Sequence, residues 1–292
     1  LVIVIRHIDL SVGFLAGFIG AVTAIALTAW SLPVYVAIPM VLVLGILGGL
    51  ITGFLVAQMK IPAFVASLAG WLIYRGALLL STEGTGTIIV PDEAFNAIGN
   101  GYIPDLPGMP EDLGLHVLTV LIGAIAIVLY ISSETNNRRK KQSYNFEVLP
   151  NEIFILKLVV VSAILGAVTW VLAGYNGLSW TLVVVLVVVG LYHFITTQTV
   201  LGRHIYAMGG NPEAAELSGI SISRITYVVF GSMGLLSALS GILFTSRLQS
   251  ATTTAGTLFE LDAIAAAYVG GVSAAGGVGK VTGSLIGALV MG

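Results

Sequence analysis

The sequence predicts an all-α fold, a polytopic bundle of transmembrane helices, and three observations support that class. Only 9% of the 292 residues are charged, whereas an average globular domain has about 25%. Hydrophobic residues make up 57% of the chain, and its apolar runs approach the roughly 20 residues that cross a bilayer. The 36 glycines are typical of membrane helices, in which small residues let backbones approach closely.

Prolines and polar segments divide the chain into about eight spans or partial spans. Pro33 and Pro62 separate the first three, because the residue before a proline disfavours the α-helical conformation. The apolar runs at the two ends, residues 1–5 and the run that begins near Ser284, are too short to cross a bilayer. We therefore expect one transmembrane domain over 1–292 that is truncated at both ends. The predicted spans cover residues 12–30, 34–57, 63–80, 114–131, 153–173, 181–197, 225–244 and, as a shorter segment, 263–272.

The placement of charge orients these spans. The segment 132–152 carries the basic run 138–141, whereas the longest polar segment, 81–113, has six acidic residues and neither Lys nor Arg. Because Lys and Arg favour the cytoplasmic side of a membrane, 132–152 is predicted to be a cytoplasmic loop and 81–113 an external one. Alternation of the spans then places ten of the twelve Lys and Arg residues on the cytoplasmic side, and with them the segment 199–224.

The segment 199–224 contains a short helix of its own. Asn211 is a favourable N-cap, Pro212 suits the first helical position, and Glu213 complements the helix dipole in the first turn. Gly219 can end the helix. A loop that only connects two spans has no need of a capped helix, so we expect a docking element; a helix lying on the membrane surface is the alternative.

The chain shows no constellation for catalysis or metal binding. It has no cysteine, and its four histidines are not paired at helical spacing with another histidine or a carboxylate. The glycine-rich segment 276–282 lacks the spacing of a phosphate-binding loop. We therefore expect no catalytic residue, metal or cofactor in this chain.

Several charged residues lie close to predicted spans, where charge is costly. Asp9 with Ser11 can cap the helix that begins at residue 12, or it can line a pathway across the membrane or form part of its gate. Arg247, Glu260 and Asp262 lie near the predicted outer edge, where they can form ion pairs or contact a ligand or a partner.

Beyond these local patterns, the chain resembles the permease subunits of ribose-, xylose- and arabinose-type importers of the ATP-binding-cassette class. The resemblance runs in order over nearly the whole chain. The amino-acid sequence of residues 6–9 and 267–282 looks most like that of xylose permeases. The similar segments are 8–13, 61–70, 75–76, 199–220, 241–247, 255–256, 260–266, 270–271, 276–277 and Gly283.

The resemblance implies a role, although the family has about ten spans where this chain shows about eight. The protein would be a permease subunit of the bacterial inner membrane and no enzyme. Two copies would form a pathway for a monosaccharide, such as the pentose xylose, delivered by an external sugar-binding protein. Two cytoplasmic ATPase subunits, which bind ATP and Mg²⁺, would drive it. We expect contact with membrane lipid and none with nucleic acid.

The resemblance also implies site residues. The segment 199–224 would be the coupling loop, seated in a groove of the ATPase through Gly202, Arg203, Gly210, Asn211, Pro212, Glu213, Ala214, Ala215, Leu217, Ser218 and Gly219. Pathway or gate candidates are Asp9, Ser11, Arg247, Glu260 and Asp262. Two alternatives remain, a secondary sugar transporter without an ATPase and a membrane receptor or scaffold that transports nothing.

Overall fold

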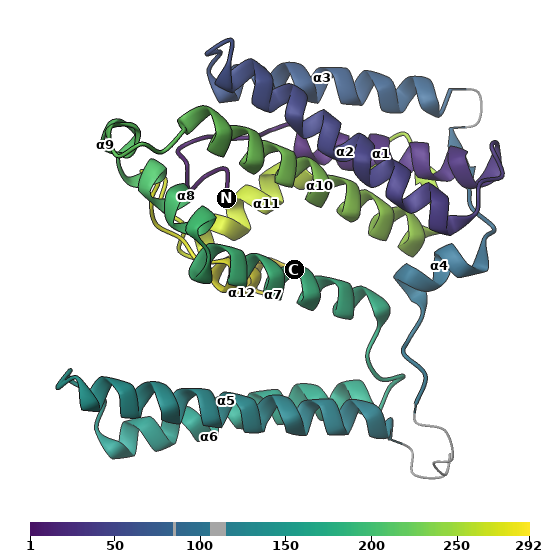
Figure 1. The fold of residues 1–292 in the computed structure, drawn as a ribbon. Helices are drawn as coiled ribbons and strands as arrows, with labels where there is room; N and C mark the ends of the chain where they lie inside the picture. The colour runs from purple at the N-terminus through teal and green to yellow at the C-terminus, as the bar shows by residue number, and fades with distance from the viewer. Residues whose placement is uncertain (84–85, 106–114) are drawn as a thin grey trace. The chain divides into compact units, whose positions relative to one another are not determined.

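The structure, a computed structural model, describes residues 1–83, 86–105 and 115–292 (Figure 1). Within that part of the chain, six helices are long and apolar enough to cross a membrane, and α1 and α12 are shorter apolar helices. The prediction of an all-α polytopic bundle is therefore confirmed. The helices are α1 (Val12–Thr28), α2 (Val34–Ala57), α3 (Ala63–Ser81), α4 (Glu93–Asn100), α5 (Val117–Ser143), α6 (Asn151–Ala173), α7 (Trp180–Gln198), α8 (Val200–Gly210), α9 (Pro212–Leu217), α10 (Ile222–Leu248), α11 (Phe259–Val269) and α12 (Val281–Met291).

Helices α5 and α10 extend beyond the predicted spans, and α11 begins four residues before the predicted segment 263–272. Helix α5 runs about three turns beyond the predicted span and into the segment 132–152, so that the basic run 138–141 is helical. Its last turn carries Lys140 and Lys141, where positive charge complements the helix dipole. Helix α10 is also longer than its apolar run, because Ser221 accepts a hydrogen bond from the Arg224 N–H and caps it early.

The predicted external loop 81–113 is structured over the part that is described. Strand β1 (Thr87–Ile89) pairs antiparallel with β2 (Ser250–Thr252), placing Ile88 opposite Ala251. Helix α4 follows and buries Phe95. The remainder of this loop, residues 84–85 and 106–113, lies outside the described residues.

The chain forms two compact units. The first comprises residues 1–100 and 184–292, and we call it the main unit. The second comprises residues 101–183, which we call the hairpin unit. Their boundary falls inside α7.

Close helix packing in the main unit depends on glycine. Helix α10 packs along α2 and α1 (Figure 1). A Cβ added at Gly49 would run into the carbonyl oxygen of Phe230, and one added at Gly234 into that of Gly45. On the α1 side, a Cβ at Gly241 would run into the carbonyl oxygen of Ala16. These glycines therefore serve helix contacts within the chain.

Two buried apolar clusters hold the main unit together. One joins α1, α2, α3 and α10 to helix α4. The other joins the first residues of the chain to α8 and α10, and its buried members include Val4, Ile5, Ile205, Met208 and Phe230. The second cluster fixes α8 against the start of the chain, and thereby positions the helix that follows α8.

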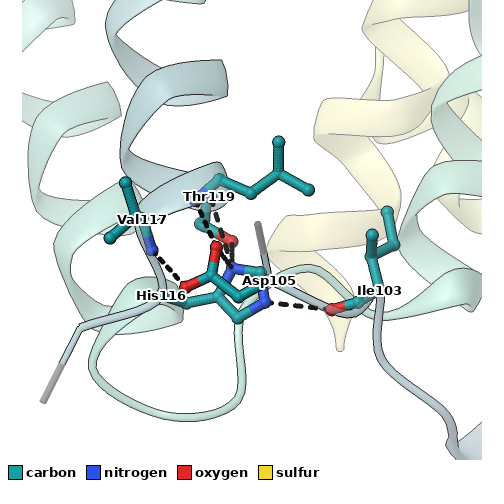
Figure 2. A network of polar contacts seen from close by, with 6 residues as sticks. Ile103, Asp105, His116, Val117 and Thr119 are labelled. Carbon is teal, nitrogen blue, oxygen red and sulfur yellow. Dashed lines mark hydrogen bonds and ion pairs between the residues drawn. The ribbon is translucent and has the colours of Figure 1, made fainter. Parts of the chain in front are cut away.

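A polar network fixes the start of α5 within the hairpin unit (Figure 2). The two carboxylate oxygens of Asp105 accept hydrogen bonds from the Val117 and Leu118 N–H groups, each at 2.8 Å. The Thr119 N–H donates to Nδ1 of His116 at 3.3 Å, so the ring proton lies on Nε2, which donates to the Ile103 carbonyl at 2.9 Å. The first free N–H groups of α5 are thus satisfied by side chains.

Replacing Asp105 with alanine will lower the thermal stability of the purified protein. Two N–H groups at the start of α5 lose their acceptor, and loss of an N-terminal cap typically costs about 1 kcal/mol. Asp105→Asn retains one side-chain oxygen as acceptor, so its melting temperature should lie between those of Asp105→Ala and the unaltered protein. Equal melting temperatures for all three would show that the network contributes no stability.

Candidate functional site

The predicted short helix is present as α9, between α8 and α10. Helix α8 begins with Thr199, whose hydroxyl accepts a hydrogen bond from the Gly202 N–H at 3.2 Å. Asn211 ends α8 and begins α9, and its side chain accepts from the Ala214 N–H at 3.1 Å. Pro212 occupies the first position of α9. The change of direction between the two helices is therefore encoded by Asn211 and Pro212.

The end of α9 is also closed by local hydrogen bonds. The Ile220 N–H donates to the Ala215 carbonyl at 3.0 Å, and the Gly219 N–H donates to the Glu216 carbonyl at 2.9 Å. Gly219 has φ +84°, in the left-handed region that glycine adopts without strain. These are the two bonds of a Schellman motif, so α9 is a defined unit of one and a half turns.

One face of α9 packs on the protein and the other is open. Ala215 is 4% exposed, whereas Leu217 is 91% exposed. The other exposed members of the predicted coupling set are Arg203, Gly210, Asn211, Glu213, Ala214, Ser218 and Gly219. The exposed face therefore combines one apolar side chain with carboxylates and small residues.

A pocket of about 730 Å³ borders α9 in the main unit. Its wall includes Arg6, His7 and Lys60, together with Glu213 and Glu216 of α9. Burial lowers the pKa of His7, and a hydrogen bond with the backbone of Arg6 opposes that effect. The lining of the pocket thus combines the positive charges of Arg6 and Lys60 with the carboxylates of Glu213 and Glu216.

Asp9 and Ser11 form a tight local pair at the start of α1. One carboxylate oxygen of Asp9 accepts from the Ser11 N–H at 2.9 Å and from the Ser11 hydroxyl at 2.6 Å. Both residues are buried, and burial raises the pKa of the Asp9 carboxyl against the opposing effect of these two bonds. Ser11 is the N-cap residue of α1, although its own side chain caps no N–H group. The pair therefore orders the entry into α1.

Glu260 joins α11 to α3. It is 4% exposed, and its Oε1 accepts a hydrogen bond from the Trp71 indole N–H at 2.9 Å. The guanidinium of Arg75 lies 5.3 Å from the centre of the Trp71 ring. The other oxygen of Glu260, Oε2, is buried with no hydrogen-bond partner among the described residues, and it faces Gly13 of α1. An unsatisfied buried carboxylate oxygen is unusual and marks a position under constraint.

Arg247 and Asp262 lie apart from Glu260 in their contacts. The Arg247 guanidinium donates to the Asn100 side-chain oxygen at 2.9 Å. Among the described residues Lys157 pairs with Glu134, and no ion pair joins Arg247 to Glu260 or Asp262. Asp262 is exposed in the first turn of α11. The sequence allowed two interpretations of Arg247, an ion pair with Glu260 or Asp262 and contact with a ligand or a partner. The structure does not form the ion pair.

Two partners of these residues were not predicted. They are Trp71, which donates to Glu260, and Arg6, which donates to the carbonyls of Gly209 and Gly210. Trp71 and Arg75 are one helical turn apart on α3, which is the only signal in the sequence that they share a face. No group of three or more His, Cys, Asp or Glu side chains that could hold a metal occurs in the part of the chain that the structure describes.

Six membrane-length helices in the described ranges define a polytopic integral membrane protein. Residues 111–292 match a family described as branched-chain amino acid transport system / permease component. The chain belongs to this family of transport-system permeases, and it is a multi-pass protein of the bacterial inner membrane. This family match, together with 36–37% identity to curated xylose and ribose permeases, confirms the predicted resemblance to ATP-binding-cassette sugar permeases.

Curated relatives match over nearly the whole chain. The xylose transport system permease protein of Haemophilus influenzae is 37% identical, over 99% of this chain and 74% of its own length. The corresponding Escherichia coli protein is 36% identical, over 99% of this chain and 71% of its own length. The ribose import permease protein of Haemophilus influenzae is 36% identical, over 100% of this chain and 68% of its own length. No solved structure gives a significant match.

Proposed function

We propose that this protein is the membrane-spanning subunit of an ATP-driven importer that carries a monosaccharide, and specifically a pentose such as xylose. The single observation that supports this most is its similarity, at 36–37% identity over 99% of the chain, to two xylose permeases. The chain itself catalyses no reaction in this proposal, because the energy comes from ATP bound with Mg²⁺ on a separate subunit.

Helix α9 couples the permease to that ATPase subunit. Its caps at both ends make it a rigid element, and its exposed residues include Leu217, an apolar contact, together with the carboxylates of Glu213 and Glu216. A helix that lies on a bilayer needs a broad apolar face to bury in lipid. The exposed face of α9 is mostly polar, which favours a protein groove over the membrane surface.

The complete importer contains two copies of this chain, two ATPase subunits and an external sugar-binding protein. ATP-driven closure of the ATPases displaces the two α9 helices, and the permease copies alternate between outward-facing and inward-facing states. Asp9 and Ser11 line or gate the pathway, and Arg247, Glu260 and Asp262 line it or contact the sugar or the protein that delivers it. The binding protein supplies most of the selectivity for the sugar.

Co-purification of the full-length protein with its neighbours tests this composition. We expect an ATPase subunit to accompany the tagged permease in a one-to-one ratio, and the assembly to contain two of each. The external binding protein should join when its sugar is present. A permease that purifies alone from mild detergent, in cells whose sugar uptake does not depend on it, would favour the receptor or scaffold alternative.

A further inference from the structure

The guanidinium of Arg6 binds the backbone at the corner between α8 and α9, which is formed by Gly209, Gly210 and Asn211. Its Nε donates to the Gly209 carbonyl at 2.7 Å, and its Nη2 donates to the Gly210 carbonyl. These two residues end α8, where backbone carbonyls lack a partner within the helix and positive charge is favourable. The next residue is Asn211, which caps α9. Arg6 is therefore hydrogen-bonded to the two residues that directly precede the N-cap of the proposed coupling helix.

Three distant segments meet around Arg6, residues 1–6, 206–210 and 276–279, and we call this meeting point the junction. The Gly277 N–H donates to the Val4 carbonyl at 2.8 Å, and the Tyr206 hydroxyl donates to the Gly279 carbonyl at 2.6 Å. A Cβ added at Gly209 would run into the Val4 carbonyl oxygen. The three segments of the junction are thus joined to one another by backbone contact and by hydrogen bonds.

The backbone conformation of Arg6 is unusual for a residue other than glycine. Arg6 has φ +65°, a left-handed conformation that suits glycine and strains other residues. Glycine would relieve the strain but would lose both hydrogen bonds to the end of α8. The arginine is therefore explained by what its guanidinium holds, and not by the local backbone.

The segment that follows Arg6 leads directly into α1. Only residues 7–10 separate it from Ser11, the N-cap residue of α1, and Asp9 orders that entry through Ser11. The Ser67 hydroxyl of α3 donates to the Ile8 carbonyl at 3.3 Å, so the same segment also contacts α3. A displacement at the end of α8 can therefore reach α1 and α3 along a short, bonded path.

We propose that Arg6 is a positioning residue that transmits the movement of α9 to the start of α1. This inference rests on the proposed coupling function of α9. Arg6 touches neither the ATPase nor the sugar in this proposal; it makes α8, the corner and the entry to α1 move together. Without the Arg6 side chain, α9 moves and α1 does not follow.

The test uses the complete importer, with ATPase and binding protein, in sealed vesicles. We expect Arg6→Gln to retain the ATPase subunits but to lower the amount of sugar imported per ATP hydrolysed at least tenfold. Arg6→Lys, which keeps the charge but lacks the planar fork that reaches two carbonyls, should recover part of the ratio. The control Arg139→Gln, in the basic run of α5, should leave the ratio unaltered. An unaltered ratio in Arg6→Gln would overturn the proposal.

A distance measurement keeps the proposal testable if Arg6→Gln fails to assemble. The chain has no cysteine, so spin labels can be placed at Ala207→Cys and Ile8→Cys, on the two sides of the Arg6 contact. We expect one distance between the labels, the same with and without ATP, while the distance from Ala207 to its counterpart in the second permease copy changes. A distance between Ala207 and Ile8 that shifts with ATP would overturn the proposal.

The two proposals fail in different ways. If altering the exposed tip of α9 does not weaken ATPase association, then α9 is no coupling helix and the proposed function is wrong in that part. If altering the tip does release the ATPase but Arg6→Gln couples normally, only the transmission by Arg6 is wrong.

Discussion

An arginine in place of Leu217 will release the ATPase subunits while the permease remains folded. Leu217 is 91% exposed at the end of α9, so the substitution removes no packing within the chain. In a groove of a partner, a charged side chain at such an apolar anchor typically costs at least about 2 kcal/mol, or roughly a 30-fold loss of affinity. The measurement is the fraction of ATPase that co-purifies with the tagged permease over a range of ATPase concentrations.

Leu149→Arg is the matched control for this experiment. Leu149 is a half-exposed leucine, at 49%, and it lies in the other predicted cytoplasmic segment, 132–152. We expect it to leave ATPase association unchanged. Equal binding by Leu217→Arg and the unaltered protein would remove α9 from the interface. Equal losses in the two variants would instead indicate a general effect of added charge.

Alanine at Gly49 will destabilise the protein, whereas alanine at Gly76 will stabilise it slightly. A Cβ at Gly49 runs into the Phe230 carbonyl oxygen and lies 2.9 Å from the Gly234 N, so α2 and α10 must separate. Overpacking of this kind typically costs about 1–3 kcal/mol. Gly76 in α3 has nothing within 4 Å of an added Cβ, and there alanine gains up to about 1 kcal/mol of helix propensity.

Melting temperatures of the two glycine variants in the same detergent provide the measurement. Comparing the two variants separates the effect of helix packing from the effect of helix propensity, because both substitutions add one methyl group inside a membrane helix. A fall at Gly49 with no fall at Gly76 is the expected result. Similar shifts at both positions would contradict the account of α2 and α10 as helices in contact through glycine.

Much of the fold follows from sequence because each span is a long apolar run bounded by proline or polar residues. The starts of α2 and α3 directly after Pro33 and Pro62 are examples. The capped helix α9 was predictable for a related reason, since its caps are local in sequence. The end of α5 was not, because the basic residues 138–141 form helix as readily as loop and only their context decides.

Contacts between distant segments could not be predicted in the same way. The bond from Trp71 to Glu260 joins residues 189 positions apart, and nothing in either local sequence names the other as partner. The contact of Arg6 with Gly209 spans 203 positions. The coupling and pathway assignments, and the external and cytoplasmic placement of the loops, stay predictions that rest on the family resemblance and the charge pattern.

Uptake of labelled xylose into vesicles that contain the complete importer tests the central claim most directly. ATP and the binding protein should together drive accumulation, and a proton ionophore should not reduce it, because the energy comes from the ATPase through α9. Substitution Leu217→Arg should abolish this accumulation. Accumulation that persists without ATP and collapses with the proton gradient would contradict the account and favour a secondary transporter.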